Sequence, residues 1–402
     1  MEFSFLVNLS IRNLYRHSRR TLILLLAIVV AIAGVVIANA LLRGMQDDIR
    51  RQVITNLNGH FKIHRSDYLA NPSIKRGFVF SPDWVPYLGD ANIDGWAARV
   101  RVPASIMSER ETRGVELIGV NPSSERISFL SAVEFDGVFL ADSRDRGVII
   151  GRALARQLKT RVGKRLVLVS EGGDGLAREA GFRIVGIYDA DSELNEKRFV
   201  FSGLETVQQF LGTAFITEIS IKTFSQDLRN LKGTLSSYFS PLQILDWQEL
   251  EPQTAAMVGY VDFGVLILFV IIMGALMFGL VNAFVTSVME RVREFGVLRA
   301  LGMAGHIVVI QVILESMLIT AVGLVFGVAG GWLIASWLSK GIDLSEWSEG
   351  VEVVGMSSVL YPNIIMEDIV LVIGLTLIFG LLSSAYPAWK AIQIKALDAI
   401  GR

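Results

Sequence analysis

Four long runs of apolar residues constrain this chain more than any other feature of its sequence. A helix needs about 20 apolar residues to cross the roughly 30 Å of hydrocarbon in a lipid bilayer. Runs of about that length or more occupy residues 21–42, 263–289, 307–338 and 369–389. Nothing comparable lies between residues 43 and 257. We therefore expect four transmembrane helices, one before and three after a large segment outside the bilayer.

The composition fits a chain that is divided between membrane and water. Hydrophobic residues make up 52% of the 402 residues, and the mean hydropathy is +0.49. The formal net charge of −1 gives no field that would draw the chain to nucleic acid. The chain has no cysteine, which excludes disulfides, thiolate metal sites and cysteine nucleophiles. The first apolar run is longer than the roughly 7–15 residues of a signal peptide, so we expect an uncleaved anchor.

Basic residues near the ends of the apolar runs predict the orientation, because cytoplasmic loops carry an excess of lysine and arginine. They precede the first run, lie between the second and third, and follow the fourth: Arg12, Arg16, Arg19, Arg20, Arg291, Arg293, Arg299, Lys390, Lys395 and Arg402. The loop between the third and fourth runs is instead acidic. We expect both termini in the cytoplasm and residues 44–257 on the opposite side.

Residues 44–257 have the pattern of a mixed α/β domain. Alternating or continuous apolar stretches at 61–64, 115–120 and 148–150 predict strands, and 165–169 with 182–188 predicts a hairpin whose glycine-rich connection forms a mobile tip. Residues 152–159 and 204–211 predict helices. The predicted organisation is an amphipathic segment and helix 1 at 1–43, the α/β domain at 44–257, and helices 2 to 4 at 258–402. The fold class is thus a four-helix membrane protein with a large α/β domain inserted between helices 1 and 2.

The sequence lacks the short motifs of several catalytic classes. It has no P-loop, no G-x-S-x-G and no H-E-x-x-H. His60 and His64 lie four residues apart, but the segment between them reads as a strand and no third ligand is in view, so we interpret both as structural. We expect a non-catalytic subunit without a metal site.

Residues 289–302 form a charged segment between the second and third apolar runs. As a helix, the segment would gather Val292, Phe295 and Leu298 on one face and place charged residues on another. Gly302 is suited to ending such a helix. This pattern fits a helix that docks into a soluble partner, and it equally fits a solvated helix that reverses the chain.

The same segment carries a resemblance to a known family. Residues 290–302 read Glu-Arg-Val-Arg-Glu-Phe-Gly-Val-Leu-Arg-Ala-Leu-Gly, which resembles the signature of the FtsX-like, MacB-type ABC transporter permeases. Segments at 12–22, 148–163 and 386–397 are similar to other parts of that family. Residues 182–188 look most like the branch of the lipoprotein-releasing transmembrane subunits LolC and LolE.

The resemblance implies a bacterial inner-membrane permease, with residues 44–257 in the periplasm, that works as a homodimer or heterodimer with two copies of a separate ABC ATPase. ATP and Mg²⁺ would bind in that ATPase, and no cofactor in this chain. The segment at 289–302 resembles the coupling helix that contacts the ATPase. The residues assigned to that contact are Glu290, Arg291, Arg293, Glu294, Phe295, Leu298 and Arg299.

The resemblance leaves three functions open. The chain extracts a lipoprotein or lipid-like substrate, serves as a MacB-like efflux permease, or transmits motion to a cell-wall hydrolase as FtsX-like subunits do. The match at 182–188 favours the first, and the size of residues 44–257 disfavours the third. The short connection between the hairpin strands departs from the long hook that recruits a periplasmic carrier in one branch, which puts carrier binding in doubt.

Two features within the third apolar run are candidates for further roles. Glu315 is its only charge, and an acid within a membrane is costly enough that it usually has a function. It serves either in coupling or as a solvated group near the helix end. Glycines form a small-residue strip of the kind that allows helices to pack closely: Gly323, Gly327, Gly330 and Gly331.

Overall fold

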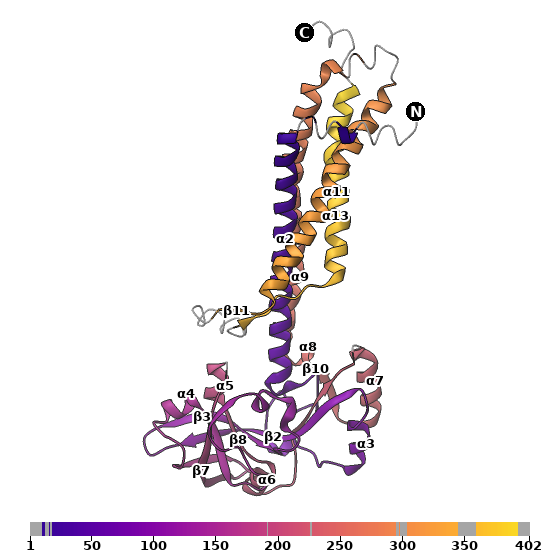
Figure 1. The fold of residues 1–402 in the computed structure, drawn as a ribbon. Coiled ribbons are helices and arrows are strands. Elements are labelled where there is room, and N and C mark those ends of the chain that lie inside the picture. Colours follow the sequence, from indigo (N-terminus) through magenta and orange to yellow (C-terminus); the bar gives the residue numbers. More distant parts are fainter. Residues whose placement is uncertain are drawn as a thin grey trace. The chain divides into compact units, whose positions relative to one another are not determined.

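The computed structural model describes residues 10–12, 16, 18–190, 192–225, 227–294, 297, 304–344 and 359–392. The chain divides into two compact units (Figure 1). The helical unit comprises residues 1–47, 259–344 and 359–402. The α/β unit comprises residues 48–258 and 345–358.

Each predicted span lies within one long helix. These helices are α2 (Ser18–Val53), α9 (Pro252–Glu290), α11 (Gly305–Leu338) and α13 (Met366–Ile392). All four are long and apolar enough to cross a membrane, which confirms the predicted layout of one helix before and three after the α/β segment. Helix α13 contains Pro387 within its last turns. A two-stranded ribbon of β11 (Ile342–Asp343) and β12 (Val359–Leu360) belongs to the same unit.

Aliphatic side chains from all four helices form the core of the helical unit. Ile28 and Ile32 of α2, Met273 of α9, Ile319 of α11 and Val372 of α13 belong to this core and are almost fully buried. Because lipid is as apolar as these side chains, close packing rather than exclusion from water must hold the helices together.

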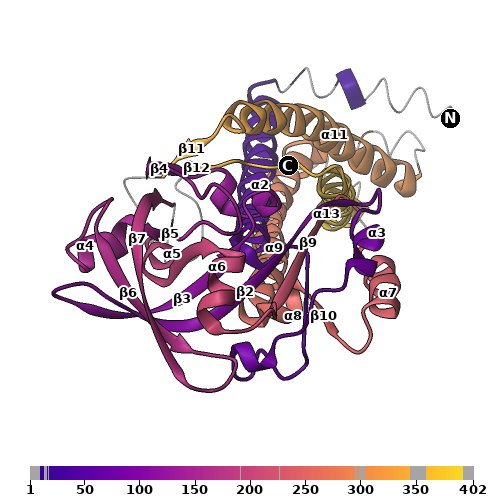
Figure 2. The same ribbon diagram turned by 90° about the horizontal axis from the view of Figure 1, so that it is seen from below.

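A ten-stranded sheet is the framework of the α/β unit (Figure 2). Nine strands follow the order β10-β1-β9-β2-β3-β8-β5-β7-β4, and β6 pairs with β2 and β7. Most pairs are antiparallel, but β3 pairs with β8, and β5 with β7, in parallel. The strands are β1 (Phe61–His64), β2 (Ile93–Met107), β3 (Thr112–Val120), β4 (Glu134–Gly137), β5 (Gly147–Gly151), β6 (Arg165–Glu171), β7 (Ala177–Asp189), β8 (Phe199–Gly203), β9 (Glu218–Thr223) and β10 (Gln243–Asp246).

Short helices connect these strands. The α-helices are α3 (Val85–Leu88), α4 (Arg152–Gln157), α5 (Glu193–Arg198), α6 (Leu204–Leu211), α7 (Leu228–Tyr238) and α8 (Trp247–Leu250). The 3₁₀-helices are η2 (Ile74–Arg76), η3 (Pro82–Trp84), η4 (Glu125–Ile127) and η5 (Phe129–Ser131). At its end, α2 continues as a π-helical turn, η1 (Ile54–Asn58).

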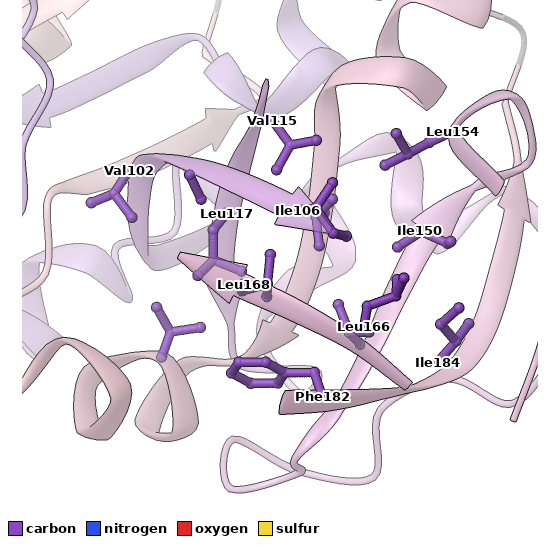
Figure 3. Close-up of a cluster of buried hydrophobic side chains, with 14 of the residues drawn as sticks. Val102, Ile106, Val115, Leu117, Ile150, Leu154, Leu166, Leu168, Phe182 and Ile184 are labelled. Atoms are coloured by element: carbon purple, nitrogen blue, oxygen red, sulfur yellow. The ribbon is translucent and has the colours of Figure 1, made fainter. Parts of the chain in front are cut away.

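The sheet packs around three separate apolar cores. The first includes Ile106, Leu166, Leu168 and Ile184, whose side chains meet between strands (Figure 3). The second lies between β1, β9 and α7, and the third joins η1 to the faces of β3, β5, β7 and β8. With its own apolar interior, the α/β unit has what a domain of this size needs for independent stability.

The predicted hairpin at 165–169 and 182–188 is present as β6 and β7, which pair from Arg165 opposite Arg183 to Glu171 opposite Ala177. The connection is therefore only residues 172–176. Its tip has contacts within the unit, because the Gly173 amide donates to the Leu211 carbonyl at 2.9 Å. Gly175 has a positive φ of 85°, a conformation that favours glycine.

Candidate coupling site

The segment predicted to contact an ATPase begins where α9 ends, at Glu290. Arg291 lies in a turn, and residues 292–294 are helical. Glu290 and Arg293 are exposed, and Val297 is 47% exposed. Phe295, Leu298 and Arg299 lie outside the described residues, as does the predicted helix end at Gly302.

Arg291 is buried, unlike its exposed neighbours. Only 8% of its side chain is exposed, and its Nη1 donates to Glu315 Oε2 at 2.9 Å. Its Nε donates to Glu294 Oε2 at 3.2 Å. Glu294 in turn accepts from Arg16 at 3.0 Å. The sequence grouped Arg291 with the ATPase contact, whereas the structure turns its guanidinium toward α11.

The ion pair between Arg291 and Glu315 joins the end of α9 to α11. Glu315 is 15% exposed, so both charges are largely removed from water. Removing one partner of such a pair leaves the other charge buried without a partner, which typically lowers the free energy of unfolding by about 3–5 kcal/mol. The pair also explains how α11 tolerates an acid within its apolar run, since intramembrane acids are usually paired. The geometry places Glu315 at a link between two helices rather than at a solvated helix end.

Three of the four predicted glycines lie against α2. A Cβ atom on Gly323 would stand 2.5 Å from Ile28 Cγ2, one on Gly327 would stand 2.7 Å from Ile32 Cβ, and one on Gly331 would stand 2.8 Å from Val36 Cβ. Such distances exclude a side chain unless the helices move apart. Gly330 faces elsewhere, since nothing lies within 4 Å of a Cβ placed there. The contact surface on α11 thus repeats every four residues, at 323, 327 and 331.

The other end of the helical unit carries an ionic cluster that was not predicted from the sequence. Arg43 of α2 donates to Asp368 of α13 through Nε at 2.7 Å and Nη2 at 2.9 Å. Its Nη1 donates to Asp262 of α9 and, at 2.9 Å, to Gln46. The sequence contained a sign of this cluster, because Arg43, Asp262 and Asp368 each directly border an apolar run at the end opposite to Arg20, Glu290 and Lys390.

A second missed group is a layer of charged side chains inside the α/β unit. Lys62 of β1, Arg99 of β2 and Glu218 of β9 are almost fully buried on one face of the sheet. Lys62 Nζ lies 3.0 Å from Glu218 Oε2, and Arg99 makes two hydrogen bonds to Glu125 at 2.6 and 2.9 Å. Each buried charge therefore has a partner of opposite sign, as burial requires.

Burial and charge act on this layer in opposite directions. Burial lowers the pKa of Lys62 to about 8, against the attraction of Glu218. Burial alone would raise the pKa of Glu218, but Lys62, Arg101 and Arg99 outweigh it and lower that pKa below its usual value. The carboxylate of Glu218 therefore stays ionised within the sheet.

The two histidines lie beside this layer in separate hydrogen bonds. His60 Nδ1 accepts from the Thr223 amide at 3.2 Å, and His64 Nδ1 lies 2.7 Å from the Arg65 carbonyl. Burial lowers the pKa of both histidines. Across the described residues, no group of three or more potential ligands could hold a metal ion.

Comparison with known protein families matches both parts of the chain. The model of the MacB-like periplasmic core domain matches residues 21–230, and that of the FtsX-like permease C-terminal region matches residues 266–396. The chain belongs to the FtsX/MacB family of ABC transporter permeases. The resemblance at residues 290–302 thus falls within the matched FtsX-like region.

Individual members of the FtsX/MacB family are similar at low identity. The lipoprotein-releasing system transmembrane protein LolC of Xylella fastidiosa (strain 9a5c) is 22% identical over 77% of this chain and 78% of its own length. The macrolide export ATP-binding/permease protein MacB of Bdellovibrio bacteriovorus is 20% identical over 71% of this chain, and the match covers 43% of that protein. The crystal structure of the periplasmic region of MacB from Actinobacillus actinomycetemcomitans is 12% identical, covers 52% of this chain and 94% of that one, and has a TM-score of 0.35.

Proposed function

We propose that this permease couples ATP hydrolysis by a separate ATPase to movement of its α/β unit, and that it extracts a lipoprotein or another lipid-like substrate from the membrane. The ATPase would contact the chain at residues 289–302. The termini and this segment would lie in the cytoplasm, and the α/β unit in the periplasm.

One observation carries the coupling part of the proposal. At the end of α9, Arg291 is fixed to Glu315 of α11 while Arg293 and Glu290 remain exposed. A partner that contacts the exposed side chains would therefore act on a segment already bonded to a second helix. Because a buried ion pair resists separation, displacement of the segment would reach α11 as well as α9.

The experiment replaces the exposed charge and spares the internal bond. In Arg293→Glu, we expect the ATPase to copurify poorly with the permease and its stimulated hydrolysis to fall by about tenfold or more, because charge reversal at an interface adds repulsion. Arg110→Glu is the matched control, since Arg110 is an exposed arginine of the α/β unit. If Arg293→Glu copurifies and stimulates like the wild type, the proposed contact is wrong.

The lipid part of the proposal rests on different support. One relative, which matches 77% of this chain and 78% of its own length, is named as part of a lipoprotein-releasing system. Its test is whether ATP releases lipoproteins from spheroplasts or proteoliposomes that contain the permease and its ATPase. Release that needs ATP and fails in a hydrolysis-deficient ATPase would support extraction.

A second candidate is efflux of small molecules. The match of the MacB-like periplasmic core to residues 21–230 favours it, because that match includes most of the α/β unit. If cells with the permease and its ATPase accumulate less of a small molecule than cells without them, and no lipoprotein is released, efflux is the better proposal than lipoprotein extraction.

A further inference from the structure

A cavity lies in the helical unit beside the ionic cluster of Arg43, Asp262 and Asp368. Its volume is about 410 Å³, toward the low end of the roughly 300–1,000 Å³ of small-molecule sites. It lies between α2, α9 and α13, which run side by side (Figure 1). Most of its lining is aliphatic or aromatic, including Val35, Leu42, Val265, Phe269 and Leu371. The walls therefore suit an alkyl chain.

The polar end of this cavity has an excess of negative charge. Arg43 supplies one positive charge against the two carboxylates of Asp262 and Asp368, and all three residues line the cavity. Each nitrogen of the Arg43 guanidinium already donates within the cluster, to Asp368, Asp262 or Gln46. Four of the five N–H groups of this guanidinium thus donate within the cluster, and an anionic ligand would meet two carboxylates and at most one remaining N–H group.

Two oxygen atoms at the cavity lack hydrogen-bond donors. The side chain of Asp262 is 57% exposed, and both hydrogen bonds given to it, from Arg43 and Gln46, go to Oδ1, which leaves Oδ2 available. Asn39 also lines this cavity, and its Oδ1 is buried and accepts no hydrogen bond from the described residues. A buried acceptor without a donor is costly, typically about 1–3 kcal/mol.

We propose that this cavity binds an amphiphile with a primary ammonium head group. The alkyl chain would lie among the apolar walls between α2, α9 and α13. The ammonium would donate N–H groups to Asp262 Oδ2 and Asn39 Oδ1 and would neutralise the excess negative charge of the cluster. The ligand is either a free cationic amphiphile or a lipid with a primary amine in its head group. The site goes beyond the proposed function, because binding there needs neither the ATPase nor transport.

The test measures binding to the full chain in nanodiscs of phosphatidylcholine, whose quaternary ammonium has no N–H group to donate. The probe is a fluorescent long-chain alkylammonium, compared with the uncharged amide and the sulfate of equal chain length. We expect saturable binding of the ammonium, with the amide and the sulfate at least about tenfold weaker, equivalent to 1.4 kcal/mol. Equal binding of all three compounds, or preference for the sulfate, would overturn the proposal.

Variants separate the site from general partitioning into the membrane. Asp262→Asn keeps the shape of the side chain and removes the excess charge, so its affinity for the ammonium should fall about tenfold, toward that of the amide. Asp136→Asn is the matched control, since Asp136 is an exposed aspartate of β4 in the α/β unit. Val265→Phe should weaken binding of the ammonium by filling the cavity. Unchanged affinity in both Asp262→Asn and Val265→Phe contradicts the proposal.

A change of lipid distinguishes the two sources of the ammonium group. Replacing part of the phosphatidylcholine with phosphatidylethanolamine adds a primary amine that can compete for the site. If the wild type then binds the probe more weakly while Asp262→Asn is unaffected, the site holds a membrane lipid. If the affinity of the wild type does not change, the site takes a free amphiphile. Both outcomes support an ammonium site.

Discussion

Arg99 Nη1 donates a hydrogen bond to the carbonyl oxygen of Leu57 at 2.7 Å. The hydroxyl of Ser220 donates to the same oxygen at 2.8 Å. Leu57 lies in η1, where α2 ends, and has a φ of 67°, which is uncommon for a residue with a side chain. The carbonyl groups at a helix end lack partners within the helix and carry partial negative charge. A buried guanidinium thus caps this helix end and ties it to β2 and β9.

The first prediction concerns this cap. Arg99→Met removes the donor to Leu57 and leaves Glu125 buried without its partner, because the Arg99 side chain is 0% exposed and pairs with Glu125. We expect the unfolding free energy of the α/β unit to fall by about 3–5 kcal/mol. Thermal unfolding of the full chain, followed by hydrogen exchange in η1 and β2, measures the change.

The double variant Arg99→Met/Glu125→Leu is the control for that prediction. It removes both charges, so it should recover part of the stability that the single variant loses. Protection from exchange at the Leu57 turn should not recover, because the cap is still missing. A single variant as stable as the wild type would show that the cap contributes nothing.

The second prediction concerns the pH dependence of the charged layer. Burial lowers the pKa of Lys62 from 10.5 to about 8. Between these values, the unfolded chain binds a proton that the folded chain has released, so the unfolding free energy should rise with pH. We expect a steeper rise between pH 8 and 10 in the wild type than in Lys62→Met. Chemical unfolding of the full chain at a series of pH values measures both slopes, and equal slopes would contradict the prediction.

The sequence predicted much of the architecture because its apolar patterns were unambiguous. Each of the four apolar runs is long enough to span a bilayer, and each lies in one helix. The predicted strand at 61–64 and helix at 204–211 have those same bounds as β1 and α6. These elements follow from local periodicity alone, without information from the rest of the chain.

The charged layer could not be predicted from the same patterns. Polar or charged residues alternate with apolar ones in β1 and through most of β9, as they do in strands that face water on one side. Burial of the charged face depends on η1 and η4, which come from distant parts of the sequence. The opposition of Arg99 and Glu218 depends on the register between β2 and β9. Neither relationship is encoded in a local segment.

The candidate coupling site was predicted only in part. The sequence identified Arg291 and Glu315 separately, but their bond joins residues 24 positions apart in two helices. The sequence contained more of the information needed for the glycine strip, because adjacent residues on a helix do not share a face. That rule separates Gly330 from Gly331, although only the structure shows that α2 covers the face of Gly331.

The third prediction compares two glycines of α11. Gly327→Leu forces a side chain against Ile32 of α2, where even a Cβ would lie 2.7 Å from the isoleucine Cβ. Overpacking of this kind typically costs about 1–3 kcal/mol. We expect a lower melting temperature for the detergent-solubilised permease. Gly330→Leu is the matched control, because nothing lies within 4 Å of a Cβ there. Equal melting temperatures for the two variants would rule out the packing role.

The fourth prediction concerns the bond between Arg291 and Glu315. Because Arg291 is buried against α11 while Arg293 is exposed, their variants should fail in different ways. Glu315→Gln weakens the bond but leaves the exposed charges in place. We expect the ATPase to copurify normally with this variant, and ATP-driven release of substrate to fall by about tenfold or more for each ATP hydrolysed. The measurement is the ratio of release to hydrolysis in proteoliposomes.

Exchanging the charges of Arg291 and Glu315 tests whether coupling needs the ion pair itself or needs each residue separately. Arg291→Glu places a second carboxylate beside Glu315. Because like charges in a poorly solvated site repel strongly, we expect this variant to be the most defective. Arg291→Glu combined with Glu315→Arg restores opposite signs across the same pair of helices. Recovery of the release-to-hydrolysis ratio in the double variant would assign the effect to the bond itself. If the double variant remains as defective as Arg291→Glu, the link between α9 and α11 does not carry the coupling.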